Sequence, residues 1–336
     1  MLVLGIETSC DETSAAIVED GRKVLSNVIY SQIDIHHQFG GVVPEIASRK
    51  HVEKISYVVD MAFKQAGLTV NDIDAVAATY GPGLVGSLLV GLSFAKALSF
   101  SKKLPFVAVN HIEGHIYANF ITYPELMPPL IVLVVSGGHT NLIILKDFEE
   151  YEVVGKTRDD AAGEAFDKIA RYLGLGYPGG PAIDKVAKLG DEDKYKYPVA
   201  DIDGYNFSFS GLKSAVINHV HGLLQKGEKF KIEDIAASFQ KTVVNILVEK
   251  TINLSLETDI KKIAVAGGVA ANSRLRKEFY EKCKQHNIEF FVPEFKYCTD
   301  NAAMIASCGY FKLQKGIVSS YRENAVPYIS LVSKKS

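Results

Sequence analysis

Two histidines and a glutamate in the segment NHIEGH, residues 110–115, are of the types that build a metal site. On a helix of about 100° per residue, His111 and His115 lie about 40° apart and can bind one ion. Glu113 lies about 200° round from His111. In the zinc protease motif HExxH the glutamate directly follows the first histidine, where it can act as base. The spacing therefore disfavours a metalloprotease. It leaves open another kind of metal site or two solvated or capped histidines.

A carboxylate near the end of the chain is a candidate third ligand. His111 follows a short buried strand, PFVAVN, and Asp300 follows the strand that we expect at the equivalent place in a second lobe. Equivalent loops from two lobes can converge. Two histidines and one carboxylate with open positions suit Fe or Zn that holds a ligand. Asp300 could equally cap the helix that begins near Ala302.

The elements that would position these residues occur twice along the chain. Three strand patterns are followed by helix, strand, helix and strand, and the same order returns from residue 129 with little sequence identity. We therefore predict two α/β lobes with a central cleft. The first lobe is expected at 1–128 plus 305–336, and the second at 129–304 with a helical insertion at about 158–256. The proline-rich stretch 122–129 is the predicted linker.

Each lobe has a tight turn between its first two strands, ETSCDETS at 7–14 and SGGHTN at 136–141. Such turns expose backbone N–H groups and hydroxyls that suit a phosphate, and glycines let a ligand approach the backbone. A plain hairpin turn is the alternative for either one alone. Two copies at equivalent places favour a nucleotide clamp.

Two further Gly-rich turns lie in the second lobe. AGGVAANS at 266–273 joins a strand to a helix at the end where α/β proteins bind ligands, so that Asn272 could face a sugar or base. Asn272 could equally be a helix N-cap. GYPGGPAIDK at 176–185 places Asp184 near a helix start, where it could take ribose hydroxyls or favour the helix dipole.

Composition narrows the class of protein. The 336 residues carry a net charge of −2, which gives no strong electrostatic sign of a nucleic-acid partner. The four cysteines show no CxxC pairing and indicate reduced thiols. The start turns acidic by residue 11 and no apolar run approaches about 20 residues, so we expect neither a signal peptide nor a membrane helix. We expect a cytoplasmic enzyme or assembly protein without a membrane segment.

The motifs together resemble one family over nearly the whole chain. They are LGIETSCDET, GGVVPEIASRKH, TYGPGLVGSLLVG, NHIEGH, VVSGGHTNL, DDAAGEAFDK, YPGGP, FSFSGLKSA, AGGVAANSRLR and CTDNAAMIA. They resemble the TsaD family of tRNA threonylcarbamoyladenosine synthases, bacterial type, formerly called O-sialoglycoprotein endopeptidases. The resemblance implies the duplicated, RNase H-like fold of actin, Hsp70 and sugar kinases.

The resemblance also implies an activity and a set of site residues. Threonylcarbamoyl would pass from threonylcarbamoyl-AMP to N6 of adenosine 37, in tRNAs that read codons beginning with A, and AMP would be released. Fe²⁺ or Zn²⁺ would be bound by His111, His115 and Asp300. The implied substrate contacts are Val134, Val135, Ser136, Gly137, Gly138, Asp167, Gly180, Asp184 and Asn272. No general base is evident, and Asp11 and Glu12 are candidates only.

The resemblance also implies partners, and two alternative functions stay open. Bacterial family members act with TsaB, a paralogue that pairs through the first lobe, and with the ATPase TsaE, while TsaC supplies the adenylate. The helices near 51–66 and 84–99 are candidates for the TsaB interface, although core packing explains the same apolar residues. A small-molecule kinase of the same superfamily and a nucleotide-switched scaffold are the alternative functions.

Overall fold

The computed structural model describes residues 1–331, and the chain forms two compact units. The first unit contains residues 1–128, 145–151 and 293 onward, and the second contains 129–144 and 152–292. The change from the first unit to the second falls between Pro128 and Pro129, at the end of the proline-rich stretch. No helix within residues 1–331 is long and apolar enough to cross a membrane.

The first unit is built on a five-stranded mixed sheet with the order β3-β2-β1-β4-β5. Its strands are β1 (Leu2–Glu7), β2 (Glu12–Glu19), β3 (Lys23–Ser31), β4 (Ala75–Gly81) and β5 (Phe106–Asn110). The three consecutive strands β1, β2 and β3 pair antiparallel, whereas β4 runs parallel to both β1 and β5. The parallel strands β1, β4 and β5 therefore end at the same edge, where the polar residues Glu7 and Asn110 lie.

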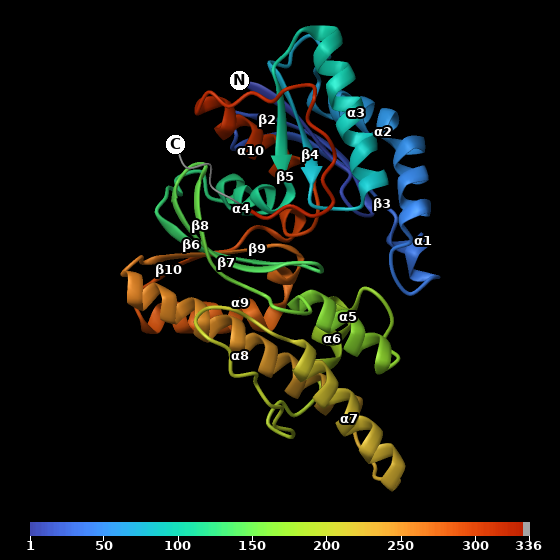
Figure 1. The fold of residues 1–336 in the computed structure, drawn as a ribbon, viewed down its shortest axis with the longest axis vertical. Helices are drawn as coiled ribbons and strands as arrows, with labels where there is room; N and C mark the ends of the chain where they lie inside the picture. Colours follow the sequence, from blue (N-terminus) through green and yellow to red (C-terminus); the bar gives the residue numbers. More distant parts are fainter. Residues whose placement is uncertain (332–336) are drawn as a thin grey trace. The chain divides into compact units, whose positions relative to one another are not determined.

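Helices cover both faces of this sheet (Figure 1). They are α1 (Ile33–His37), α2 (Pro44–Ala66), α3 (Val85–Lys102), α4 (His111–Thr122), the short 3₁₀ helix η2 (Phe295–Tyr297) and α10 (Ala302–Gln314). Because side chains alternate along a strand, Leu4 and Ile6 face the core formed with α2 and α3. Gly5 faces α10, so closely that a Cβ there would lie 2.2 Å from the Ala302 carbonyl oxygen.

The second unit has a five-stranded sheet of its own, with the order β10-β9-β6-β7-β8. Its strands are β6 (Leu130–Val135), β7 (Thr140–Asp147), β8 (Glu150–Lys156), β9 (Lys262–Ala266) and β10 (Glu289–Phe291). Its helices are α5 (Ala162–Tyr172), α6 (Gly179–Ala187), α7 (Ser210–Lys226), α8 (Ile232–Thr258), the 3₁₀ helix η1 (Gly268–Ala271) and α9 (Ser273–Gln285). Leu130–Val135 is buried at every position, as expected of a strand covered on both faces.

The two sheets have the same strand order. Read from the β8 edge, the second sheet has the order β8-β7-β6-β9-β10. In both sheets the strands of the unit therefore follow one another as third, second, first, fourth and fifth. The duplicated pattern predicted from the sequence is therefore confirmed.

The limits of the units differ from the expected ones at two places. Residues 293–304 and 145–151, expected in the second lobe, group with the first unit. The first segment leads into α10, which packs on β1 and α4. The second is the β7–β8 turn, where Phe148 stacks on Phe311 of α10 at 4.3 Å between ring centroids. Apolar and ionic contacts with α10 thus assign both segments to the first unit.

Candidate metal centre and substrate-binding residues

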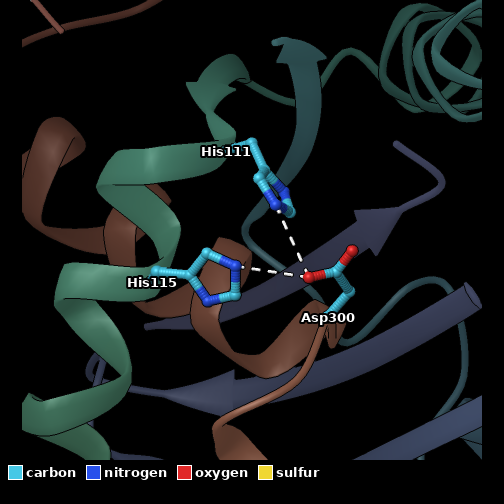
Figure 2. Close-up of side chains that lie close together, drawn as sticks. All are labelled: His111, His115 and Asp300. Carbon is cyan, nitrogen blue, oxygen red and sulfur yellow. Dashed lines mark ion pairs between the residues drawn. The ribbon is translucent and has the colours of Figure 1, made fainter. Parts of the chain in front are cut away.

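The two histidines lie at the start of α4, directly after β5. The Asn110 side chain caps this helix, because its Oδ1 accepts a hydrogen bond of 2.8 Å from the Ile112 N–H. His111 is therefore the first helical residue and His115 follows one turn later, on the same side of α4 (Figure 2). Both imidazoles are buried.

Asp300 completes the cluster from the loop that precedes α10. Its Oδ1 lies 3.5 Å from His111 Nε2 and 3.2 Å from His115 Nε2 (Figure 2). The alternative role for Asp300, capping the helix, falls to its neighbour Asn301, whose Oδ1 accepts from the Met304 N–H at 3.1 Å. The three predicted ligands thus converge within the first unit, with one ligand atom of each within 4.8 Å of the others.

The donor set fits a divalent metal. Two imidazole nitrogens, His111 Nε2 and His115 Nε2, face the same oxygen of the Asp300 carboxylate. Two buried imidazole nitrogens that share one carboxylate oxygen form the type of donor set that binds a divalent metal. Three protein ligands leave positions open for a substrate. The cluster could therefore hold a metal, and the ligand types fit Fe²⁺ and Zn²⁺ alike.

Burial and neighbouring charges shift the pKa values of the two histidines in opposite directions. Burial alone would lower the pKa of His111, but the carboxylates of Asp300 and Glu7 outweigh it and raise this pKa to about 9. For His115 burial dominates and lowers the pKa. Burial would raise the pKa of Glu7, but the neighbouring charge of His111 lowers it. A metal cation would replace the proton on His111 Nε2, the nitrogen that faces Asp300.

Glu113 points away from this cluster. Its carboxylate lies 2.7 Å from Lys312 Nζ of α10, and Lys312 also forms an ion pair with Glu149 in the β7–β8 turn. Glu149 accepts a further hydrogen bond of 2.7 Å from the Tyr117 hydroxyl. The glutamate of NHIEGH therefore belongs to a buried ionic network that joins α4 to α10. It cannot act as base to a ligand at the histidines, which agrees with the geometry expected from the spacing.

The turn between β1 and β2 is held by the buried side chain of His51. Its ring contacts the Thr13 hydroxyl at 2.8 Å and the Cys10 carbonyl oxygen at 3.0 Å. Asp11 is buried in this turn, and Glu12 accepts a hydrogen bond of 3.1 Å from the Ser31 hydroxyl. Burial, and then the charges of Asp11 and Asp300, raise the pKa of Glu12 well above its ordinary value. This turn is thus held by hydrogen bonds and carries two acidic residues, one of which has a raised pKa.

The SGG turn of the second unit lies between β6 and β7, at the place predicted. It is closed by the Ser136 N–H, which donates to the His139 carbonyl at 2.8 Å. A Cβ on Gly163 would lie 2.5 Å from the Ser136 oxygen, whereas added Cβ atoms on Gly137 and Gly138 would meet open space. α5 therefore supports one side of the turn. Gly137 and Gly138 leave the other side of the turn open to a ligand.

The other predicted substrate-binding residues of the second unit lie in α5, in α6 and at the start of α9. The Asp167 carboxylate accepts from the Gly179 N–H at 2.7 Å, at the start of the helix that carries Gly180. Asp184, one turn beyond Gly180, accepts from the Ser273 hydroxyl at 2.8 Å. These bonds place Asp184 beside the first residues of α9.

Asn272 performs the alternative role considered for it. Its Oδ1 accepts from the Leu275 N–H at 2.9 Å and so caps α9, while its Nδ2 donates to Gln240 Oε1 at 2.8 Å. Gln240 and Glu7 were not anticipated from the sequence. Glu7 lies in the motif ETSCDETS, but only the register of β1 and β5 brings it to His111. Lys312 is the one charged residue of the otherwise apolar helix α10. A charge in such a segment needs a buried partner, so the sequence could have indicated the ionic network around Lys312.

Comparison with solved structures identifies the class of fold. Full-length HypF in a phosphate- and nucleotide-bound form matches with a TM-score of 0.61 at 17% identity, covering 94% of this chain and 46% of that one. Component A of (R)-2-hydroxyglutaryl-CoA dehydratase from Acidaminococcus fermentans matches with a TM-score of 0.54 at 17% identity over 94% and 99% of the chains. A glucokinase of the ROK family from Streptomyces griseus matches at 0.50, with 13% identity over 94% and 100%. The two sheets and these neighbours show that the chain has the α/β fold of the actin and sugar-kinase type.

Sequence comparison then gives the family within that class. The family model for TsaD, tRNA N6-adenosine threonylcarbamoyltransferase, matches residues 23–307. Proteins of that name from Caldicellulosiruptor bescii and Caldicellulosiruptor saccharolyticus are 92% and 80% identical, each over 100% of both chains. One from Clostridium botulinum is 58% identical over 98% of this chain and 97% of its own. The chain belongs to the TsaD family.

Proposed function

We propose that this chain, a tRNA N6-adenosine threonylcarbamoyltransferase, takes its acyl group from threonylcarbamoyl-AMP. The acceptor would be N6 of adenosine 37 in tRNAs that read codons beginning with A, and the compartment the cytoplasm. The match to relatives of that activity over the full chain carries the proposal. The amine nitrogen attacks the carbamoyl carbon, the bond from that carbon to the phosphate oxygen breaks, and AMP leaves while N6 loses a proton.

His111, His115 and Asp300 would hold Fe²⁺ or Zn²⁺, since they converge and leave coordination positions open. When bound, the metal would supply Lewis-acid stabilisation to the reacting carbonyl or the leaving phosphate. The protein residues bury the ligand cluster on one side with α4 and hold Asp300 in place through the Asn301 cap.

The adenosine of the donor would lie on the second unit. Asp184 and Asn272 are joined through Ser273, and Gly180 precedes Asp184 by one helical turn, so that these residues can form one surface for ribose and base. Asp167 fixes the start of α6 beside them. The open side of the SGG turn at Gly137 and Gly138 would approach the phosphate, together with the ends of Val134 and Val135 in β6.

The proton from N6 needs an acceptor, and Glu12 is our candidate ahead of Asp11. Its raised pKa, caused by burial and two neighbouring carboxylates, is the property that a general base near neutral pH requires. Asp300 of the proposed metal cluster is one of these two carboxylates, so the raised pKa of Glu12 depends partly on that cluster.

The proposed partners are tRNA, a TsaB paralogue and the ATPase TsaE. A net charge of −2 provides little attraction to phosphate, so that a partner which contributes to tRNA binding is expected. For TsaB we propose the exposed apolar side chains of α2 and α3. They are Val52, Tyr57, Val85, Leu89 and Phe100, with exposed fractions from 42% to 72%. Side chains of this size and exposure on two helices indicate a protein interface.

The test is reconstitution with TsaB, TsaE, threonylcarbamoyl-AMP and unmodified tRNA, followed by digestion and mass spectrometry of the nucleosides. Wild type should form threonylcarbamoyladenosine, and His111→Ala/His115→Ala should not. His219→Ala/His221→Ala is the matched control, because it removes two histidines of α7 in the second unit and should retain activity. A folded, metal-loaded wild type that forms no product would refute the proposed function.

A further inference from the structure

A buried carboxylate lies behind the metal cluster, on the side of His111 away from Asp300. Glu7, the last residue of β1, is fully buried, and its Oε2 lies 3.3 Å from His111 Nδ1. The other ring nitrogen of His111, Nε2, is the one that faces Asp300. Glu7 and the metal position therefore lie at opposite nitrogens of one imidazole.

Glu7 is itself held rigidly. Its Oε1 accepts from the Ser9 N–H at 2.5 Å, and its Oε2 accepts from the Thr79 hydroxyl at 2.5 Å. These contacts join the ends of β1 and β4, next to the strand that leads into α4. A carboxylate that is fixed by the sheet in this way can fix the imidazole that it contacts.

An ionised carboxylate only accepts hydrogen bonds, so that His111 must present a protonated Nδ1 to Glu7. The remaining nitrogen, Nε2, is then the one whose lone pair is available to a metal. Ser9 also contacts His111 Nδ1, with its hydroxyl at 3.2 Å, but a hydroxyl can donate or accept and does not select a tautomer. Selection of the metal-binding tautomer therefore depends on the carboxylate.

We propose that Glu7 is a positioning residue of the metal centre, which holds His111 in the orientation and tautomer that bind the ion through Nε2. This inference rests on the metal site of the proposed function. It concerns how the site is prepared and not the transfer reaction. Carboxylates that orient metal-binding histidines typically change metal affinity about 10–100-fold when they are replaced.

Glu7→Gln is the informative substitution, because it keeps the size of the side chain. A glutamine has one acceptor oxygen, and the Ser9 N–H requires it at the Oε1 position. The amide NH₂ then occupies the Oε2 position and donates toward His111 Nδ1, while the Thr79 hydroxyl can turn to accept. This arrangement favours a proton on Nε2, the nitrogen that the metal needs.

The experiment measures Zn²⁺ affinity by competition with a chromophoric chelator, for the full chain. Glu7→Gln should bind Zn²⁺ about 10–100-fold more weakly than wild type. Ser9→Ala keeps the carboxylate and should bind close to wild type. Glu113→Gln is the matched control, since it replaces another buried carboxylate that faces Lys312, and it should also bind like wild type.

A second measurement needs no variant and stands if Glu7→Gln fails to fold. In Zn²⁺-loaded wild type labelled with ¹⁵N-histidine, NMR should show His111 with the metal on Nε2 and the proton on Nδ1. Wild-type affinity in folded Glu7→Gln, or metal on Nδ1 in wild type, would overturn the inference. Wild type that binds no Zn²⁺ would overturn it together with the metal centre, and the transfer assay would report separately on the activity.

Discussion

Replacing Glu113 and Lys312 separates a structural role for the NHIEGH glutamate from a catalytic one. The side chains of Glu113, Lys312 and Glu149 are only 10%, 10% and 9% exposed, and one ammonium group pairs with two carboxylates. Lys312→Met leaves both carboxylates buried without this cation. Removal of one partner from a buried ion pair costs about 3–5 kcal/mol, so that the free energy of unfolding should fall by that amount.

Glu113→Gln should cost less. Burial raises the pKa of Glu113 in spite of the charge of Lys312, which means that burying the charged carboxylate carries a cost that a neutral amide avoids. The amide also leaves Lys312 paired with Glu149. We expect a loss of at most one charged hydrogen bond, about 1.5–3 kcal/mol, with threonylcarbamoyl transfer retained.

Urea denaturation of Lys312→Met, Glu113→Gln and the double variant measures these losses of unfolding free energy. The transfer assay is run on each variant. The double variant should be less destabilised than the sum of the single ones, because the two residues interact. A Lys312→Met variant that loses less than about 1 kcal/mol would show that the network is not buried as described. A folded Glu113→Gln variant without activity would return Glu113 to the chemistry.

Three further outcomes are expected. Burial would raise the pKa of Asp160, but Lys213 and Lys168 lower it below the ordinary 3.8. Its contribution is therefore complete above pH 3.8 and is lost as the pH falls from there through the lowered pKa. Asp160→Asn should cost about 1.5–3 kcal/mol at pH 7 and progressively less below pH 3.8 in urea denaturation. Gly163→Ala should push against Ser136, cost about 1–3 kcal/mol, and weaken AMP binding in calorimetry. Chelation should lower the melting temperature of wild type, since a metal at 100 times its Kd contributes about 2.7 kcal/mol, but not that of the variant without both histidine ligands.

Local patterns were sufficient for much of the fold and for the histidine part of a cluster that could hold a metal. The histidine spacing, the strand before it and the duplicated order of elements are all short-range features, and the structure agrees with them. The sequence left open whether Asp300 is a metal ligand or a helix cap, because a carboxylate can do either. In the structure the cap is Asn301. Asn272 was likewise open between a ligand contact and a helix cap, and it proved to be the cap of α9.

Contacts between segments that lie far apart in the sequence could not be predicted from sequence patterns. Glu7 meets His111 only because β1, β4 and β5 lie in parallel register, which places the ends of these strands side by side. The assignment of 145–151 to the first unit likewise depends on Phe148 and Glu149 meeting α10. Hydrophobic periodicity identifies such elements but does not state which surface each one will contact.

The position of α10 has a consequence for the order in which the protein matures during synthesis. Domains generally fold as they emerge, the N-terminal one first. Here the sheet of the first unit is complete at Asn110, yet the face at Gly5 is covered only when residues 302–314 have left the ribosome. The second unit, whose residues are all made before Pro293, can therefore finish first. Asp300 arrives in the same last segment, so any metal that needs all three residues could be bound only after this segment is made. A chain that stops early would present an uncovered apolar sheet to chaperones and proteases.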